Sequence, residues 1–227
     1  MRLRLLGICA VLVCFALVGG SAWADSVTVL NPSFGTFNPL TSTGGCAPGC
    51  AYNVSGVPDW TNVGTTAGSF QPGSGPTYFS VPLPDGNVLA YVIDGSLSQD
   101  LGALLPDTTY TLTVEVGDRL DGQSGNFSIA LDDGGTLECG DSGSSSSITA
   151  GTFAAETCSF TTGSDPVGDL VVVLGNNNTN LQADFADVTV NEVSAPEPTS
   201  IALLGAGLMF VGLFAAYQRR KGLHSVS

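Results

Sequence analysis

Two long apolar runs, one at each end of the 227-residue chain, limit what can fold between them. The first covers residues 5–18 and follows two arginines, and the second covers residues 201–217 and precedes three basic residues. Runs with such flanks are typical of segments that enter a membrane rather than a compact core. We therefore expect the folded part of the chain to lie between them, in residues 25–193.

The N-terminal run has the three parts of a secretory signal peptide. Arg2 and Arg4 form its basic region, and the apolar run is too short to span a bilayer comfortably. Ala22-Trp23-Ala24 then supplies the small-x-small pattern that signal peptidase accepts. The prediction is a signal peptide at residues 1–24, with Ala22 and Ala24 at the cleavage site and a mature start at Asp25. A retained anchor is the alternative.

The C-terminal run has the length and flanks of one transmembrane helix. Residues 199–217 would span about 28 Å as an α-helix, close to the hydrocarbon thickness of about 30 Å. The basic end, residues 219–221, should stay in the cytoplasm, which places the domain outside the inner membrane. A buried core helix is the alternative, but a helix that is apolar on all sides beside a basic cluster favours a membrane span.

Pro196-Glu197-Pro198, the glycine-bearing apolar run and the basic end follow one another in residues 194–227. This tail resembles the PEP-CTERM sorting signal of Gram-negative bacteria. The resemblance implies that an exosortase recognises Pro196, Glu197 and Pro198 and processes the tail, so that the protein is held at the inner membrane only transiently. It also implies a cell-surface or extracellular location in a biofilm matrix rich in exopolysaccharide. The alternative is a plain proline-rich stalk before an anchor.

Charge is distributed very unevenly along the chain. Residues 25–195 hold 19 acidic residues and one basic residue, Arg119, and so carry a net charge of −18. Nucleic-acid binding needs lysine and arginine to neutralise phosphate, so this composition excludes it for the exported domain. An acidic surface keeps a domain soluble and attracts cations.

The middle of the chain has the pattern of short β-strands. Tyr110, Leu112, Val114 and Val116 alternate with polar residues, which predicts a strand with one buried face. The 30 glycines and 12 prolines indicate frequent turns, and residues 142–147 read as a mobile serine loop. We predict an all-β fold, an antiparallel β-sandwich of jelly-roll type. The other expected strands are residues 27–30, 88–93, 125–131, 152–160, 170–174 and 185–190.

Several short motifs occur in the order found in galactose-binding-like jelly rolls. They are Asn31-Pro32-Ser33-Phe34, then Trp60, then Gln99-Asp100-Leu101, then Pro106 to Tyr110, and finally Phe185 to Val188. The domain is similar to that family, which includes many carbohydrate-binding modules. The resemblance implies a structural Ca²⁺ where the opening and closing strands meet. The acidic position after the opening Phe is Gly35 here, so Asp187 is the one matching candidate ligand. No other cofactor is expected.

Four cysteines fall in the exported domain, which predicts disulfides. Four cysteines allow three pairings, and we favour Cys46–Cys50 and Cys139–Cys158 because each pair is close in sequence. The second bridge would tie two neighbouring strands, with a stabilisation of about 3 kcal/mol. A zinc site is the alternative, but the domain has no histidine and its cysteine spacing is not that of a zinc finger.

Catalytic constellations are scarce in the exported domain. The single histidine, His224, follows the predicted membrane segment, which excludes a Ser-His-Asp triad or a Cys-His pair in the domain. Paired carboxylates could serve a glycoside hydrolase, but Asp118 with Asp121, and Asp132 with Asp133, are equally typical of solvated turns. We therefore predict no catalytic residues and a protein that is not an enzyme.

Aromatic side chains suggest the remaining functional interpretation. Exposed rings stack on the apolar faces of sugars, and Trp60 and Tyr52 are the candidate ligand-binding residues, with Tyr78 and Tyr91 as further candidates. Trp60 and Tyr91 could instead belong to the core. The expected function is an exported surface or matrix protein that binds polysaccharide weakly. The alternatives are a purely structural or adhesive protein and a carboxylate-dependent glycoside hydrolase.

Overall fold

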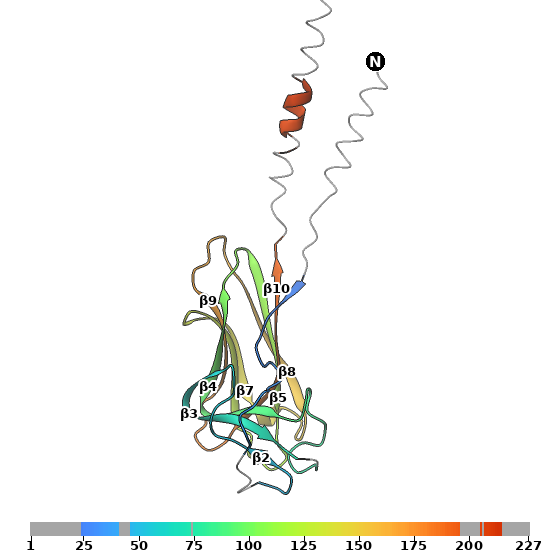
Figure 1. Cartoon of the computed structure of the whole chain (residues 1–227), viewed down its shortest axis with the longest axis vertical. Helices are drawn as coiled ribbons and strands as arrows, with labels where there is room; N and C mark the ends of the chain where they lie inside the picture. The colour runs from blue at the N-terminus through green and yellow to red at the C-terminus, as the bar shows by residue number, and fades with distance from the viewer. Residues whose placement is uncertain (1–23, 41–45, 74, 196–204, 206, 215–227) are drawn as a thin grey trace, which may run out of the picture. The chain divides into compact units, whose positions relative to one another are not determined.

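Antiparallel strands make up almost all of the regular structure between Ala24 and Ser194, which form one compact unit. The computed structural model describes residues 24–40, 46–73, 75–195, 205 and 207–214 (Figure 1). The strands are β1 (Ala24–Val27), β2 (Ala51–Tyr52), β3 (Thr61–Gln71), β4 (Leu89–Ala103), β5 (Thr108–Gly117), β6 (Asn126–Asp133), β7 (Thr136–Ser144), β8 (Phe153–Thr161), β9 (Asp169–Asn176) and β10 (Ala183–Ser194).

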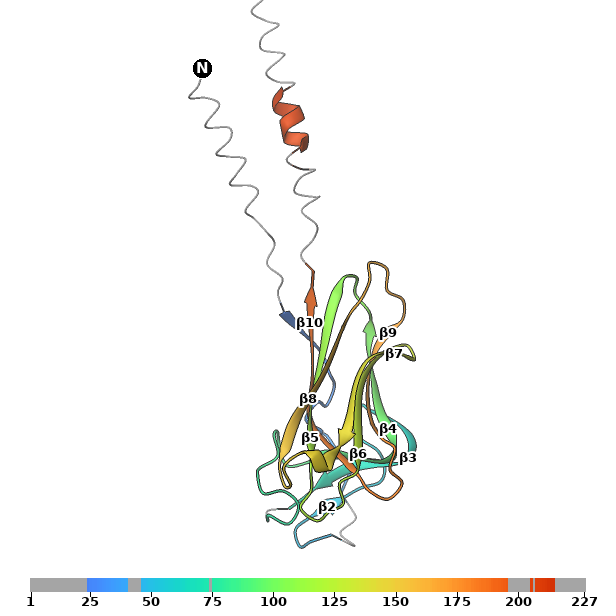
Figure 2. The same cartoon turned by 180° about the vertical axis from the view of Figure 1, so that it is seen from behind.

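The sheet folds over on itself at β4, because the two halves of that strand pair with different neighbours. Residues 90–92 pair with β10, and residues 95–103 pair with β9. The strand order is β7-β6-β9-β4-β10-β5-β8, with β3 on the other edge of β4 and β1 on β10. Two layers result, as Figures 1 and 2 show from opposite sides. The prediction of an all-β antiparallel fold is confirmed, and the strands belong to one sheet that curves almost into a barrel.

The main core lies between the two layers. On β5, Tyr110, Leu112, Val114 and Val116 are at most 2% exposed, as the alternation of that segment predicts. They pack with inward residues of β6, β9 and β10, such as Phe185. Burial of this apolar area is the main source of stability for the fold.

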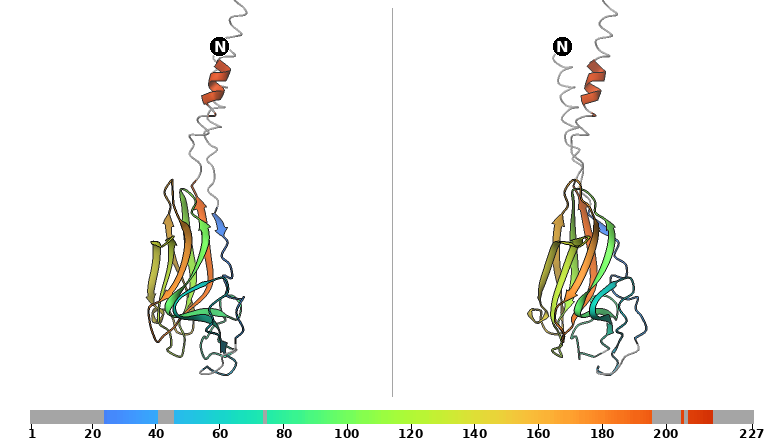
Figure 3. Two further views of the ribbon diagram at one scale, coloured as in Figure 1. Left: turned by 60° about the vertical axis from the view of Figure 1, so that its left-hand side comes forward. Right: turned by 90° about the vertical axis from the view of Figure 1, so that its left-hand side faces the viewer.

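The segment between β1 and β4 covers one face of the sandwich near one end (Figure 3). The buried Gln99 amide holds the start of this segment. Its Nε2 donates to the backbone oxygens of Leu30 and Asp59, both at 2.9 Å, and its Oε1 accepts from the Leu30 N–H at 2.7 Å. Asn31 adds a second clamp, because its side chain bonds both backbone groups of Thr36. Two of the jelly-roll motif residues therefore position this covering segment.

Three expectations about local structure were wrong. The first strand spans Ala24–Val27 rather than residues 27–30, because it pairs with the end of β10. The strand β3 was not expected at all. The prediction of a mobile serine loop at residues 142–147 is also wrong, because β7 pairs with β6 as far as Ser144 and a 3₁₀ turn (Ser145–Ser147) follows. Ser145 is fully buried, and its N–H donates to the Gly125 oxygen at 3.0 Å.

Both predicted disulfides are confirmed. Cys46 and Cys50 are joined within a tight loop, with Cα atoms 6.1 Å apart. Cys139 on β7 and Cys158 on β8 are joined with Cα atoms 5.7 Å apart. Because β7 and β8 are the two ends of the strand order, the second bridge joins the edges of the two layers.

The expected C-terminal membrane helix, residues 199–217, falls largely outside the described residues. Residues 207–214 are helical and exposed. Within the described part of the chain, no helix has both the length and the apolar character that a membrane crossing requires.

Candidate functional site

A second, smaller apolar cluster lies where the covering segment meets the sandwich. It contains residues of the segment, such as Phe70 and Tyr78, together with Leu89 and Tyr91 of β4 and Ala186 of β10. On β10, Phe185 points into the main core, so its neighbours Asp184 and Ala186 point toward this second cluster. The polar residues that concern function are gathered around it.

Arg119, the single basic residue of the exported domain, is buried against this cluster with 8% exposure. Its guanidinium carbon lies 4.6 Å from the centre of the Tyr78 ring and 5.0 Å from that of Phe70. Asp121 binds the same group with both carboxylate oxygens, one of them through an Nε–Oδ1 bond of 2.9 Å. Ring faces and a two-pronged carboxylate are the partners that the planar guanidinium favours.

Asp184 lies close to Arg119 and is completely buried. Burial raises the pKa of its carboxyl group to about 7, although the nearby Arg119 charge and the Gln182 hydrogen bond act in the opposite direction. Gln182 Nε2 donates to Oδ1 at 2.6 Å, while Oδ2 has no hydrogen-bond partner in the part of the chain that the structure describes. A buried carboxyl group with an unsatisfied oxygen is a recognised mark of a functional site.

Arg119 and Asp121 of this polar group line a pocket of about 370 Å³. Three aromatic side chains, those of Tyr52, Phe70 and Tyr91, line it as well. Tyr91 is fixed by a 2.8 Å bond from its hydroxyl to the Asn53 oxygen, and burial raises its pKa to about 12. We call this the Arg119 pocket. Its remaining lining residues are Cys46, Val54, Thr66, Ile93, Gln123, Asn180 and Gln182.

The structure separates the two candidate ligand-binding residues. Tyr52 lines the Arg119 pocket. Trp60 is 7% exposed and belongs to the main core, where its ring centre lies 5.6 Å from that of Phe34. Its indole N–H donates to the Asn31 oxygen at 3.4 Å. The core interpretation therefore holds for Trp60, and its ring faces are not available to a ligand.

The Asp118–Asp121 pair does not form an open acid–base site, because Asp118 is buried and Asp121 is engaged with Arg119. Asp132 and Asp133 are partly buried. Burial raises the pKa of Asp132, and the charge of Asp133 adds to that effect.

Asp187, the candidate calcium ligand, lies at the bulge in β10 with φ 45°. There the Val188 N–H donates to the Pro32 oxygen at 3.0 Å, so the opening and closing segments do meet. Burial raises the pKa of the facing Glu115, and the charge of Asp187 adds to that effect. Across the described residues, no group of three or more acidic, histidine or cysteine side chains could hold a metal ion. The calcium site therefore stays a prediction.

Most residues of the processing sites lie outside the described residues. These are Ala22 of the signal peptide and the sorting motif Pro196, Glu197 and Pro198, whereas Ala24 begins β1. Sequence reasoning also missed Arg119 and Asp184. A single arginine in a domain of net charge −18 is a signal that could have pointed to the first.

Comparisons with known proteins match both parts of the chain. The model of the HpiC1-like family, described as HpiC1 cyclase, matches residues 25–191, and the model of the PEP-CTERM protein-sorting motif matches residues 194–221. The second match confirms the predicted tail and implies an exported protein that an exosortase sorts. A search of curated proteins finds no match.

Solved structures resemble the domain at low sequence identity. The Stig cyclase Fisc from Fischerella sp. TAU, in complex with (3Z)-3-(1-methyl-2-pyrrolidinylidene)-3H-indole, is 20% identical with a TM-score of 0.60, covering 76% of this chain and 100% of its own. A cyclase from Fischerella sp. TAU in complex with 4-(1H-indol-3-yl)butan-2-one is 20% identical with a TM-score of 0.59, covering 75% and 98%. These likenesses establish the fold.

Carbohydrate-binding jelly-roll modules are also among the structural neighbours. The tandem CBM22 domain of Paenibacillus barcinonensis Xyn10C is 8% identical with a TM-score of 0.48, covering 79% of this chain and 49% of its own. A likeness at this level says nothing about a ligand.

Proposed function

The chain belongs to the HpiC1-like family, described as HpiC1 cyclase, through residues 25–191, and from the lining of its pocket we propose that the exported domain is a non-enzymatic sugar-binding module. The site is the Arg119 pocket. After the exosortase has processed the tail, the domain acts at the cell surface or in an extracellular polysaccharide matrix. The observation that carries the proposal is that aromatic, carboxylate and amide side chains line one pocket together.

The two kinds of lining side chain match the two kinds of surface on a sugar ring. Tyr52, which is half-buried, offers apolar ring surface for the C–H face of a pyranose. Asp121, Gln123 and Asn180 offer acceptors and donors for its hydroxyl groups. A pocket of about 370 Å³ lies within the range of about 300–1,000 Å³ that is usual for ligand sites.

Charge limits the class of sugar. Asp121 binds the one guanidinium group, the charges of Asp118 and Asp121 both act on the nearby Asp184, and the whole domain carries a net charge of −18. A negative potential of this kind repels uronic acids and sulfated sugars. We therefore assign the pocket to neutral or amino sugars.

Binding without turnover is supported by the state of the carboxyl groups. Asp184 is 0% exposed and does not line the pocket, so a ligand resting there does not reach it. Asp121 lines the pocket, but both its oxygens bind Arg119. Neither group is placed as the acid or base of a hydrolase, which needs direct contact with the glycosidic oxygen or a water.

Titration of the purified full-length chain with neutral oligosaccharides tests this proposal. Tyr52→Ala should weaken binding at least tenfold, while the exposed β8 variant Thr157→Ala should bind as the parent does. Unchanged affinity in Tyr52→Ala would show that the Arg119 pocket is not the site. Product release from a neutral or acidic polysaccharide panel would contradict the non-enzymatic part.

A second candidate function is acid-catalysed cyclisation of an unsaturated ligand. It is favoured by one observation, the Asp184 carboxyl group, which has a pKa of about 7 and an Oδ2 without a hydrogen-bond partner among the described residues. Its other oxygen accepts from Gln182, which lines the pocket. The Asp184 O–H would protonate an alkene carbon, a ring carbon–carbon bond would close onto the resulting cation, and loss of a proton would return Asp184 to its acid form. The domain would have to open to admit the ligand.

Indole compounds test this second candidate, because solved cyclases of similar fold hold them. The probe is 4-(1H-indol-3-yl)butan-2-one for binding and an alkene-bearing indole for turnover. Turnover that is lost in Asp184→Asn, with binding retained, would establish the cyclase function. The cyclase function would be excluded if no turnover is seen and sugar binding survives in Asp184→Asn.

A further inference from the structure

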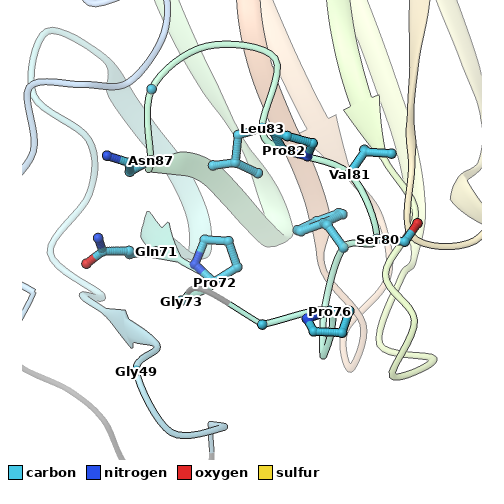
Figure 4. Close-up of a pocket in the computed structure, with 13 residues that line it drawn as sticks. Gly49, Gln71, Pro72, Gly73, Pro76, Ser80, Val81, Pro82, Leu83 and Asn87 are labelled. Atoms are coloured by element: carbon cyan, nitrogen blue, oxygen red, sulfur yellow. The ribbon is translucent and has the colours of Figure 1, made fainter.

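A second cavity, of about 660 Å³, lies on the covering segment, bordered by the loops that precede and follow Phe79. We call it the proline cleft. Figure 4 shows the rings of Pro72, Pro76 and Pro82 around it, with Leu83 and Val81 along one side. The amide side chains of Gln71 and Asn87 lie together at the other end. The remaining lining residues are Gly49, Gly73, Gly75, Phe79, Ser80 and Gly86.

The walls of the cleft are fixed to the rest of the domain. The Ser80 N–H and Oγ–H both donate to the Gly151 oxygen, at 2.8 and 3.1 Å. Phe79 stacks on Phe153 of β8 with ring centres 4.6 Å apart. Gly73 has φ +80°, and a Cβ there would lie 2.8 Å from the Gly49 carbonyl carbon, so the two loops pack backbone to backbone. A cavity held in this way is formed before a ligand arrives, which lowers the entropic cost of binding.

Among the described residues, no charged side chain lines the proline cleft, although the domain around it carries a net charge of −18. Asp85 belongs to the same loop, is exposed and is not among the lining residues. The cleft offers rigid apolar ring surface, two neutral amides and the backbone of several glycines. An anion would meet the negative field of the domain, and a cation would find no carboxylate partner. An uncharged ligand with both C–H and hydroxyl groups fits this lining.

The proline cleft and the Arg119 pocket are separate. Their described lining residues do not overlap, and the β2–β3 ribbon runs between them, with Ala51 opposite Gln71 and Tyr52 opposite Phe70. Consecutive strand residues point to opposite faces, so Gln71 lines the cleft while Phe70 lines the Arg119 pocket. A ligand can therefore occupy one site without blocking the other.

We propose that the proline cleft is a second binding site, which takes a segment of an uncharged polysaccharide. Its volume exceeds that of the Arg119 pocket, as a site for more than one sugar unit requires. The proposal for the cleft depends only on the residues that line it. The consequence that one exported domain joins two polysaccharide chains rests also on the proposed sugar binding at the Arg119 pocket.

Calorimetric stoichiometry tests the proposal. The full-length chain, in a detergent without a sugar headgroup, is titrated with cellohexaose, laminarihexaose and a mannuronate hexamer. The expected result is two sites for a neutral hexamer and at least tenfold weaker binding of the anionic one. Val81→Trp places a large ring in the cleft and should leave one site. Leu137→Trp, on exposed β7, is the matched control and should keep two.

The variants separate failure of the cleft from failure of the Arg119 pocket. Two sites that persist in Val81→Trp, with an unchanged unfolding temperature, would overturn the cleft proposal. One site that is lost in Tyr52→Ala but kept in Val81→Trp would also overturn it and would leave the proposed function intact. One site that is lost in Val81→Trp but kept in Tyr52→Ala would support the cleft and refute the Arg119 pocket. Absence of binding to every hexamer would refute both.

Discussion

Asp184 shows how one buried side chain can set the pH dependence of a whole domain. An unfolded aspartate has a pKa of about 3.9, and burial raises the folded value to about 7. The protonated form is therefore the one compatible with folding. The contribution of Asp184 to the free energy of unfolding is therefore fully present below pH 4 and is lost as the pH rises through 7.

Asp184→Asn should remove this loss of stability. Urea unfolding at pH 5 and pH 8 measures it: relative to the variant, the parent should lose on the order of 2–3 kcal/mol between the two pH values. The exposed Asp165→Asn serves as the control and should follow the parent at both. A parent and an Asp184→Asn variant with parallel pH profiles would contradict a raised pKa at this position.

Arg119 is the residue whose shape matters as much as its charge. Its guanidinium lies over two rings and binds both oxygens of Asp121. Lysine keeps the charge but cannot lie flat between rings or bind in two prongs. Arg119→Lys should therefore lower the free energy of unfolding by about 2–3 kcal/mol. Thr157→Lys, which adds a lysine on the exposed face of β8, should change it by less than about 0.5 kcal/mol.

At the level of single elements, strands with strict alternation could be predicted and the others could not. β5 alternates threonine with large apolar residues, so both its position and its buried face follow from the sequence. β3 contains Gly64 and Gly68, which weaken the strand pattern. Gly68 is required there because a Cβ would lie 2.1 Å from the Asn53 oxygen. Its strand conformation depends on pairing with β4, a contact distant in sequence.

The Cys139–Cys158 bridge is an element-scale device, because it joins β7 and β8 at the open edges of the two layers. Replacing both cysteines by alanine should lower the free energy of unfolding by about 3 kcal/mol, from the loop-closure entropy alone. Denaturant unfolding of the double variant measures this, and adding reductant to the parent, which opens both bridges, should cost at least as much. The Cys46–Cys50 loop is shorter, so the corresponding double variant should cost less. Equal losses for the two pairs would argue against the entropic origin.

At the scale of the whole molecule, the candidate site arises where distant segments meet. The Arg119 pocket draws Tyr52 from β2, Arg119 from the loop after β5, and Gln182 from the residues before β10. Neither their spacing nor their residue types mark them as neighbours in the sequence. The tail, by contrast, could be predicted from the sequence, because its three parts are contiguous and each has its own physical signature.

That contiguity makes the tail the part of the molecule that can be removed with the clearest result. Deletion of residues 196–227 should move the protein from the membrane fraction to the soluble fraction outside the inner membrane, because the apolar run and its basic end go with it. Replacing Pro196, Glu197 and Pro198 by alanine is the matched control. It keeps the apolar run but removes the sorting motif, so the chain should stay in the membrane at full length. Fractionation with immunoblotting measures both, and a deleted chain that still sediments with membranes would contradict the anchoring role of the tail.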